Sequence, residues 1–223
     1  MEKRVIFHGH TLRATGAPMP HASQSSAQRI FLLSPANASG IRGKRLLGGR
    51  AQFDLALKLR ATGASLGELF SFMSSLYFRG KLAYAQRFAN PPAGLAGVYV
   101  ITSSRGLLAP EAIVTLEELR AMSSARIDHK SPEYRVPLER DARLLSESTG
   151  NDTQVVLLGS IATQKYVGPL LEILGRRLLL PSDFVGRGDM SRGALLLRCS
   201  RDSTQLKYLA VADAVRRGVR PGR

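Results

Sequence analysis

Three short apolar runs, each followed by a polar or glycine-containing loop, limit the possible folds of this chain most strongly. They occupy residues 29–34, 97–102 and 154–160, and none shows the alternation of a half-exposed strand. Continuous apolar runs of this length indicate strands that are buried on both faces, as in a parallel sheet. Segments with helical patterning separate the runs. We therefore expect an α/β fold, a three-layer sandwich around a mainly parallel sheet.

The segments between these runs carry helix signals. Ser65 and Thr115 are each followed three residues later by a glutamate, Glu68 and Glu118, which is the spacing of a capping box. Gly63 is expected to end the helix before it. The expected helices cover residues 51–62, 65–88, 115–122, 137–148 (with Pro137 at its start) and 164–174. Further strands are expected at 177–180 and 194–199, followed by a helix, or a strand and a helix, at 204–217.

The charge of the chain is strongly positive and unevenly distributed. Its 223 residues include 32 Lys+Arg and 17 Asp+Glu, which gives a net charge of +15. Residues 1–60 carry +8 and residues 187–223 carry +6, whereas residues 61–186 carry only +1. An excess of this size favours a nucleic-acid partner. We divide the chain into a basic N-terminal arm (1–28), a single α/β domain (29–215) and a basic C-terminal tail (216–223).

The composition excludes several classes of protein. Forty-four per cent of the residues are apolar, so a collagen-like or low-complexity chain is excluded. Cys199 is the single cysteine; it permits neither an internal disulfide nor a cysteine-rich zinc site, and we expect a buried structural thiol. The N-terminus does not read as a secretory signal, and no window is apolar enough to span a membrane. We expect a cytoplasmic protein without a cofactor or metal.

The loops that follow the three apolar runs contain the first candidate site residues. In a parallel sheet, ligands bind beyond the carboxyl ends of the strands, where backbone N–H groups form anion sites. Ser34, Ser103 and Ser160 are expected at these ends, with Arg105 close to the second. The first loop also carries several side chains suited to a phosphate, although a flexible connection without a ligand explains it equally: Asn37, Arg42, Lys44 and Arg45. Its spacing is not that of a Walker loop.

Residues 74–84 interleave aromatic and basic side chains on an expected helix. Tyr77, Lys81 and Tyr84 fall near one face, and Arg79 lies between them. Such a face is suited to stacking a base while holding its phosphate. The alternative is that the aromatic residues belong to the core and that Arg79 is an ordinary surface charge.

Residues 183–193 form the most unusual stretch, with three glycines, two arginines and two aspartates. We expect a glycine-rich basic loop in which Arg187 and Arg192 contact phosphates. Asp189 is the one candidate for general acid–base chemistry, or else a partner that holds one of these arginines. The alternative is a plain turn with solvated charges. No catalytic triad, paired carboxylates or metalloprotease motif accompanies it, and the lone His129 is expected to be solvent-exposed.

Two segments resemble known families. Residues 30–36, Ile-Phe-Leu-Leu-Ser-Pro-Ala, resemble the strand and Ser-Pro-Ala opening of the YaaA family, and residues 100–111 resemble a later segment of that family. The second segment is also similar to the core domain of archaeosine synthase. Residues 78–85 look like a helix of related small bacterial domains. The resemblance covers about residues 29–115; Asn37 stands where the YaaA pattern has Lys, and the cysteine motif of the archaeosine core is missing.

The resemblance implies a partner that is nucleic acid or one of its bases. YaaA-like proteins are associated with DNA binding and with protection from oxidative damage, and archaeosine synthase modifies a deazapurine base in tRNA. Whether this chain is an enzyme stays open.

Three hypotheses follow. The first is a protein that binds nucleic acid, with DNA as the expected form, in which a base stacks on Tyr77 or Tyr84 and phosphates are held by Arg42, Lys44, Arg45, Arg79, Lys81, Arg105, Arg187 and Arg192. The second is an enzyme that modifies or cleaves a nucleotide or nucleobase, with Asp189 as the acid–base group and the strand-end serines on phosphate. The third is a non-catalytic interaction protein in a larger assembly.

Overall fold

The structure is a computed structural model that describes residues 27–74, 76–162 and 164–214. Within these residues, six strands form one mixed, mostly parallel sheet in the order β4-β3-β1-β6-β7-β8. The strands are β1 (Arg29–Leu33), β3 (Val98–Ile101), β4 (Leu107–Leu108), β6 (Gln154–Leu158), β7 (Leu178–Pro181) and β8 (Tyr208–Ala210). The four inner strands pair in parallel, and β4 and β8 are antiparallel edges. The expected α/β fold with a mainly parallel sheet is confirmed.

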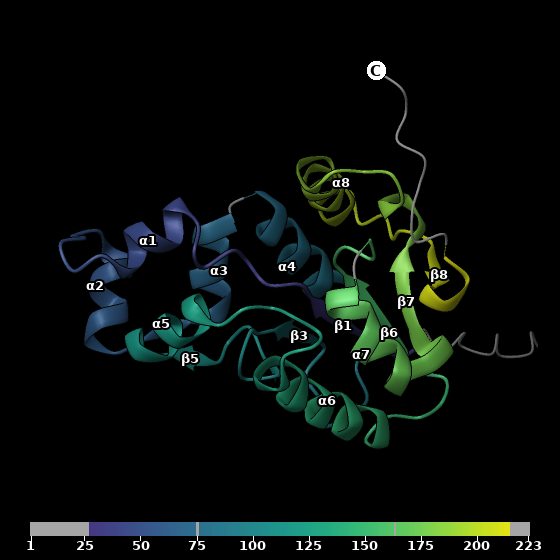
Figure 1. Ribbon diagram of the computed structural model, residues 1–223. Helices are drawn as coiled ribbons and strands as arrows, with labels where there is room; N and C mark the ends of the chain where they lie inside the picture. The colour runs from purple at the N-terminus through teal and green to yellow at the C-terminus, as the bar shows by residue number, and fades with distance from the viewer. Residues whose placement is uncertain (1–26, 75, 163, 215–223) are drawn as a thin grey trace, which may run out of the picture.

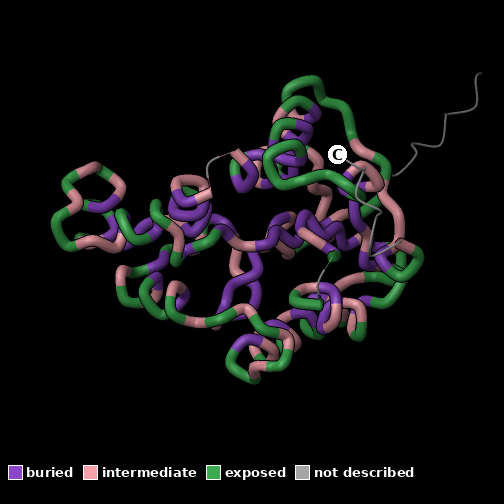
Figure 2. The backbone as a smooth tube through the Cα atoms, turned by 45° about the horizontal axis from the view of Figure 1, so that its top comes forward, coloured by how far each residue is buried: buried purple, intermediate pink, exposed green. Residues whose placement is uncertain are grey.

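The central strands are buried on both faces, as their continuous apolar runs predict. Ile30 to Leu33 in β1 and Val155 to Leu158 in β6 have no exposed surface. Because successive side chains of a strand point to opposite faces, Phe31 belongs to one hydrophobic cluster and Leu32 to the other. Figure 2 shows this buried region as the purple tube that runs through the middle of the molecule.

Helices cover both faces of the sheet (Figure 1). Side chains of α4 (Leu76–Phe88) and α8 (Asp189–Arg201) pack with Phe31, and side chains of α6 (Pro132–Glu147) and α7 (Gln164–Leu174) pack with Leu32. The other helices gather to one side of the sheet with a small second sheet. They are α1 (Ile41–Leu47), α2 (Asp54–Ala61), α3 (Leu66–Ser74) and α5 (Leu116–Ser124), and the second sheet pairs β2 (Ala64–Ser65) with β5 (Ile113–Val114) in antiparallel fashion.

The contact between α4 and α8 is a close approach of two backbones. A Cβ atom on Gly80 would lie 2.6 Å from the carbonyl oxygen of Gly193, and one on Gly193 would lie 2.9 Å from the Cα of Tyr77. Both distances are shorter than side chains permit, so only glycine fits at this crossing. The predicted loop up to residue 193 and the predicted strand at 194–199 are wrong, because α8 begins at Asp189.

Several helix boundaries follow the predicted signals. Thr115 and Glu118 form a complete capping box, and Ser65 and Glu68 exchange the same hydrogen bonds. Gly63, with φ of +80°, follows α2 as predicted. Pro137 is an error of prediction: α6 begins five residues earlier at Pro132, which occupies the first turn, and Pro137 lies inside the helix.

The predicted strand at 177–180 is confirmed as β7, and the helix at 164–174 is confirmed as α7. Most of the arm (1–28) and the whole tail (216–223) lie outside the described residues. Within the described ranges, none of the helices combines the length and the apolar character that crossing a membrane requires.

Candidate functional site

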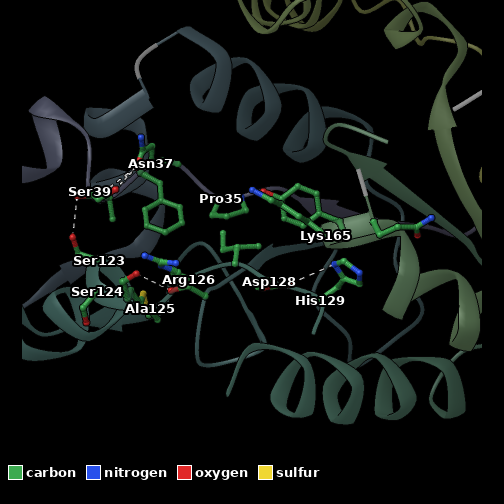
Figure 3. Close-up of a pocket in the computed structure, with 18 residues that line it drawn as sticks. Pro35, Asn37, Ser39, Ser123, Ser124, Ala125, Arg126, Asp128, His129 and Lys165 are labelled. Atoms are coloured by element: carbon green, nitrogen blue, oxygen red, sulfur yellow. Dashed lines mark hydrogen bonds and ion pairs between the residues drawn. The ribbon is translucent and has the colours of Figure 1, made fainter. Parts of the chain in front are cut away.

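A cavity of about 870 Å³ lies where the chain leaves β1 and β3 and where α7 begins after β6 (Figure 3). The polar loops that the sequence places at strand ends therefore contribute to one cavity. Its lining comes from three segments and two single residues, namely residues 35–39, Phe70, Ser103, 122–129 and 164–166. Ser34 and Ser160 lie next to these segments but are not part of the lining.

The rim formed by the β1–α1 loop is held in place by local hydrogen bonds. Asn37 Oδ1 accepts from the backbone N–H of Ser39 at 3.2 Å and from its hydroxyl at 2.8 Å. The Ser123 hydroxyl donates to the Ala38 carbonyl at 3.2 Å and ties the loop to α5. Gly43 lies so close to Ala38 that a Cβ atom would fall 1.8 Å from its carbonyl oxygen. The rim is thus preorganised, which lowers the entropy that a ligand must overcome.

The connection between α5 and α6 supplies the side chains that the sequence analysis missed. Figure 3 shows Arg126, Asp128 and His129 below the cavity, opposite Asn37 and with Lys165 at its far side. His129, predicted to be solvent-exposed, is half-buried with Nδ1 3.6 Å from Asp128 Oδ1. Neither motif nor periodicity marks this polar segment, and it reaches the cavity only through the packing of α5 on α1.

Two predicted residues after β3 are already engaged within the protein. The buried Ser103 hydroxyl donates to the Met122 carbonyl at 2.8 Å, which fixes the end of α5 against β3. Arg105 forms an ion pair with Glu118 at 2.8 Å. Ser103 therefore lines the cavity mainly as a group that positions α5. The guanidinium of Arg105 is not free, because it already has a carboxylate partner. Ser160 accepts a hydrogen bond from the Ala162 N–H at 3.3 Å.

Lys81 is buried beneath the end of β1. Its ammonium donates to the Ser34 hydroxyl at 2.8 Å and to the Ser34 carbonyl, and it lies 4.4 Å from the centre of the Tyr77 ring. Burial lowers the pKa of Lys81 to about 7. Lys81 is only 1% exposed, so its ammonium lies inside the fold, and its predicted contact with a phosphate stays a prediction.

Tyr84 is also misassigned by the sequence analysis. It is fully buried against Phe31, and its hydroxyl accepts from the Leu206 N–H at 2.8 Å and shares a hydrogen bond of 2.6 Å with the Tyr208 hydroxyl. No face of the ring is left for a base, so the alternative that this aromatic residue belongs to the core is correct.

The start of α8 brings Asp189 and Arg192 to the same region. Arg192 is buried and donates from Nε and Nη2 to the Phe184 carbonyl, with Nη1 3.5 Å from Asp189 Oδ1. The predicted contact of Arg192 with a phosphate therefore stays a prediction, as for Lys81. Asp189 has a side chain 67% exposed. Arg187 is exposed, and its guanidinium donates to the Ser191 hydroxyl at 3.3 Å.

A second concavity, of about 460 Å³, unites three of the arginines predicted to hold phosphates. Arg42 and Arg45 of α1 line it together with Arg79 of α4, and Ser71 and Phe72 of α3 complete it. In the described part of the chain, none of the three arginines has a carboxylate within ion-pair distance. We call this surface the arginine concavity. Lys44 is exposed on α1 beside it without lining it.

The cavity and the arginine concavity are neighbours on the same two elements. Phe70 of α3 lines the cavity, and the next two residues of that helix line the arginine concavity. Likewise, Asn37 to Ser39 line the cavity, and the chain then enters α1, which carries Arg42 and Arg45.

The remaining chemistry of the described residues is limited. Cys199 is a buried free thiol, as predicted, and burial raises its pKa. Among residues 27–214, positions 75 and 163 apart, no three His, Cys, Asp or Glu side chains are grouped so as to hold a metal ion. Comparison of the chain with models of protein families, with curated proteins and with solved structures finds no match.

Proposed function

We propose that this protein binds nucleic acid, with one base in the strand-end cavity and the adjoining phosphates on the arginine concavity. The observation that carries the proposal is the adjacency of the two depressions across residues 70–72 of α3. A nucleic-acid strand presents the matching pair of groups, a flat polar base and an anionic backbone, in each nucleotide.

The cavity has the size and lining that a base requires. Its volume of about 870 Å³ lies within the range of small-molecule sites. The half-buried Tyr166 offers aromatic surface for stacking, and Asn37 and Gln164 offer amide groups that hydrogen-bond with base edges. The polar groups would select the base and the aromatic ring would supply sequence-tolerant affinity.

The arginine concavity suits phosphates because its guanidinium groups are exposed and unpaired. Arginine binds phosphate oxygens through two parallel N–H bonds, so three such side chains can hold two or more successive phosphates. Arg45 lies with its guanidinium carbon 5.6 Å from the centre of the Phe53 ring, which restricts its orientation. The net charge of +15 attracts a polyanion over a longer range.

Binding to duplex DNA, single-stranded DNA and RNA across a salt series tests the proposal. The matched variants each remove three arginines: Arg42→Ala/Arg45→Ala/Arg79→Ala from the concavity and Arg140→Ala/Arg143→Ala/Arg176→Ala from ion pairs elsewhere. Each lost phosphate contact lowers the slope of log K against log salt by about 0.7–0.9, so the first variant loses about 2 in slope.

The control variant removes the same charge but no phosphate contact, and its slope stays close to that of the wild type. Equal slopes in the two triple variants would remove the arginine concavity from the interface. Affinity that does not depend on salt in the wild type would refute nucleic-acid binding of this kind altogether.

A second candidate function is an enzyme acting on a nucleotide or nucleobase. The observation in its favour is that Asp189 lies near enough to Tyr166 of the cavity lining to act on it. Burial raises the pKa of Tyr166 to about 12, and the charge of Asp189 adds to this rise. Replacing Asp189 by Asn would then abolish turnover while ligand affinity is kept. A variant with full turnover would contradict this function.

The finer expectations about the chain stay proposals. They are the three-layer sandwich, the basic arm and tail, and a cytoplasmic setting. The resemblance of residues 29–115 to the YaaA family supports the same class of partner, nucleic acid or its bases.

A further inference from the structure

Behind the cavity wall lies a buried polar cluster that neither concavity includes. It consists of Tyr77 and Lys81 on α4 and Asp189 and Arg192 on α8, and we call it the α4–α8 cluster. Tyr77, Lys81 and Arg192 are 8%, 1% and 9% exposed. The cluster lies close to the cavity at two points. Lys81 donates to Ser34, which precedes Pro35 of the lining, and the charge of Asp189 acts on Tyr166 of the lining.

The cluster holds more positive charge than its own carboxylate balances. Within the described residues, the Lys81 ammonium has no carboxylate within ion-pair distance; it meets only the neutral oxygens of Ser34 and the rings of Tyr77 and Phe78. Asp189 lies 3.5 Å from Arg192 and is largely solvent-exposed. Burying a cation without an anion costs free energy, and a bound anion removes that cost.

The Tyr77 hydroxyl provides a further sign of a missing partner. It is buried, and no described residue meets hydrogen-bond geometry with it, although the Arg192 guanidinium comes close enough to act against the burial that raises its pKa. A fold seldom leaves such a group unsatisfied without a ligand or water at that place. Arg192 and Asp189 both act electrostatically on this hydroxyl, so it belongs to the charged region.

We infer that the α4–α8 cluster is an anion subsite that receives a phosphate group of the ligand held in the strand-end cavity. This inference rests on the proposed function, because the phosphate belongs to a nucleotide there. Two cations and a hydroxyl donor match a phosphate, which carries more than one negative charge and several acceptor oxygens. Asp189, with a side chain 67% exposed, forms the solvent side of the cluster.

The effect of an anion on Lys81 gives the inference a spectroscopic signature. Burial now favours the neutral amine, since it lowers the pKa of Lys81 to about 7, and Arg192 acts in the same direction. A phosphate beside the ammonium favours the charged form. Binding of inorganic phosphate therefore raises the pKa of Lys81, which ¹⁵N NMR of the lysine side chains follows directly.

The experiment uses the full chain and inorganic phosphate, with chloride at equal ionic strength as reference. Calorimetry measures phosphate affinity in the wild type and in Tyr77→Phe and Lys81→Met, each paired with a control that makes the same change elsewhere, Tyr99→Phe and Lys207→Met. Both positions lie outside the cluster and the cavity lining. We expect each cluster variant to lose about tenfold in affinity, because a hydrogen bond to a charged group is lost, and each control to bind like the wild type.

The inference would be overturned if the cluster variants bound phosphate as tightly as their controls do. So would a wild-type protein that phosphate neither binds nor shifts at Lys81. Should Lys81→Met not fold, Tyr77→Phe and the NMR titration of the wild type decide the matter alone.

A nucleoside and its 5′-monophosphate separate this inference from the proposed function. Tighter binding of the monophosphate than of either phosphate or the nucleoside supports both. Phosphate binding that the nucleoside part does not improve supports the anion subsite and refutes a base in the cavity. Nucleoside binding that the phosphate does not improve refutes the subsite for this ligand and leaves the base-binding cavity standing.

Discussion

Lys81 extends from α4 to the end of β1, where its ammonium contacts the carbonyl and hydroxyl of Ser34. The contact fixes the residue from which the cavity rim begins, since Pro35 and Ala36 line the cavity. Its aliphatic stem packs within the core, and its charge faces Tyr77 on its own helix and Asp189 and Arg192 on α8. Lys81 therefore both holds the start of the cavity rim in place and carries a charge of the candidate site.

The titration of Lys81 predicts how stability changes with pH. Its pKa is about 7 in the folded protein against 10.5 for an ordinary lysine, so above pH 7 the unfolded chain binds a proton that the folded chain has released. Stability therefore rises with pH from about 7, by on the order of 1–3 kcal/mol up to pH 9. Above that range, Cys199 and the buried tyrosines, whose pKa values are raised, act in the opposite sense.

Urea unfolding at pH 7, 8 and 9 checks this prediction on the wild type, Lys81→Met and the surface control Lys207→Met. The rise should be present in the wild type and the control and absent from Lys81→Met. The same pH dependence in all three proteins would show that Lys81 keeps its proton throughout the range.

At the scale of the elements, the crossing of α4 and α8 decides where the buried polar groups lie. Gly80 and Gly193 let the two backbones touch, and this brings the first turn of α8 against Tyr77. Tyr77 and Lys81 are one helical turn apart on α4, and Asp189 and Arg192 are one turn apart on α8. Four polar residues from two helices therefore meet without any loop between them.

Gly193→Ala is predicted to destabilise the protein by about 1–3 kcal/mol, because the new methyl group would lie 2.9 Å from the Cα of Tyr77 and force the helices apart. Gly49→Ala is the control, since nothing lies within 4 Å of a Cβ atom there. Thermal or urea unfolding measures both. A neutral effect at Gly193 would mean that the helices separate at little cost and that the crossing does not fix the cluster.

Prediction from the sequence succeeded where local signals decide the structure and failed where packing does. Buried strands and capping boxes are encoded in a few neighbouring residues, so β1, β6 and the start of α5 were predicted correctly. The start of α8 was not, because a glycine-rich segment has low helix propensity and Gly193 is stabilised by contact with Gly80. The burial of Lys81 was not predicted, because its charge, and not its reach to Ser34, is visible in a sequence.

At the scale of the whole molecule, the candidate site combines an expected part and an unexpected one. Strand-end loops were expected to converge, and residues 35–39, 103 and 164–166 do so in one cavity. The segment 123–129 was not expected there, because only the packing of α5 against α1 and the β1–α1 loop brings it to the cavity. The arginine concavity then adjoins the cavity on α1 and α3, and the account of function depends on this adjacency.

The most direct measurement uses single-stranded oligonucleotides that carry one 2-aminopurine, a fluorescent base whose access to acrylamide reports whether it is enclosed. Ala125→Trp fills the cavity from its lining, and Ala121→Trp, one turn earlier on the exposed side of α5, is the matched control. The account predicts that the wild type and the control shield the base from acrylamide, and that Ala125→Trp loses this shielding while its salt-dependent affinity persists. Tight binding in which the base stays open to acrylamide in the wild type would contradict a base in the cavity.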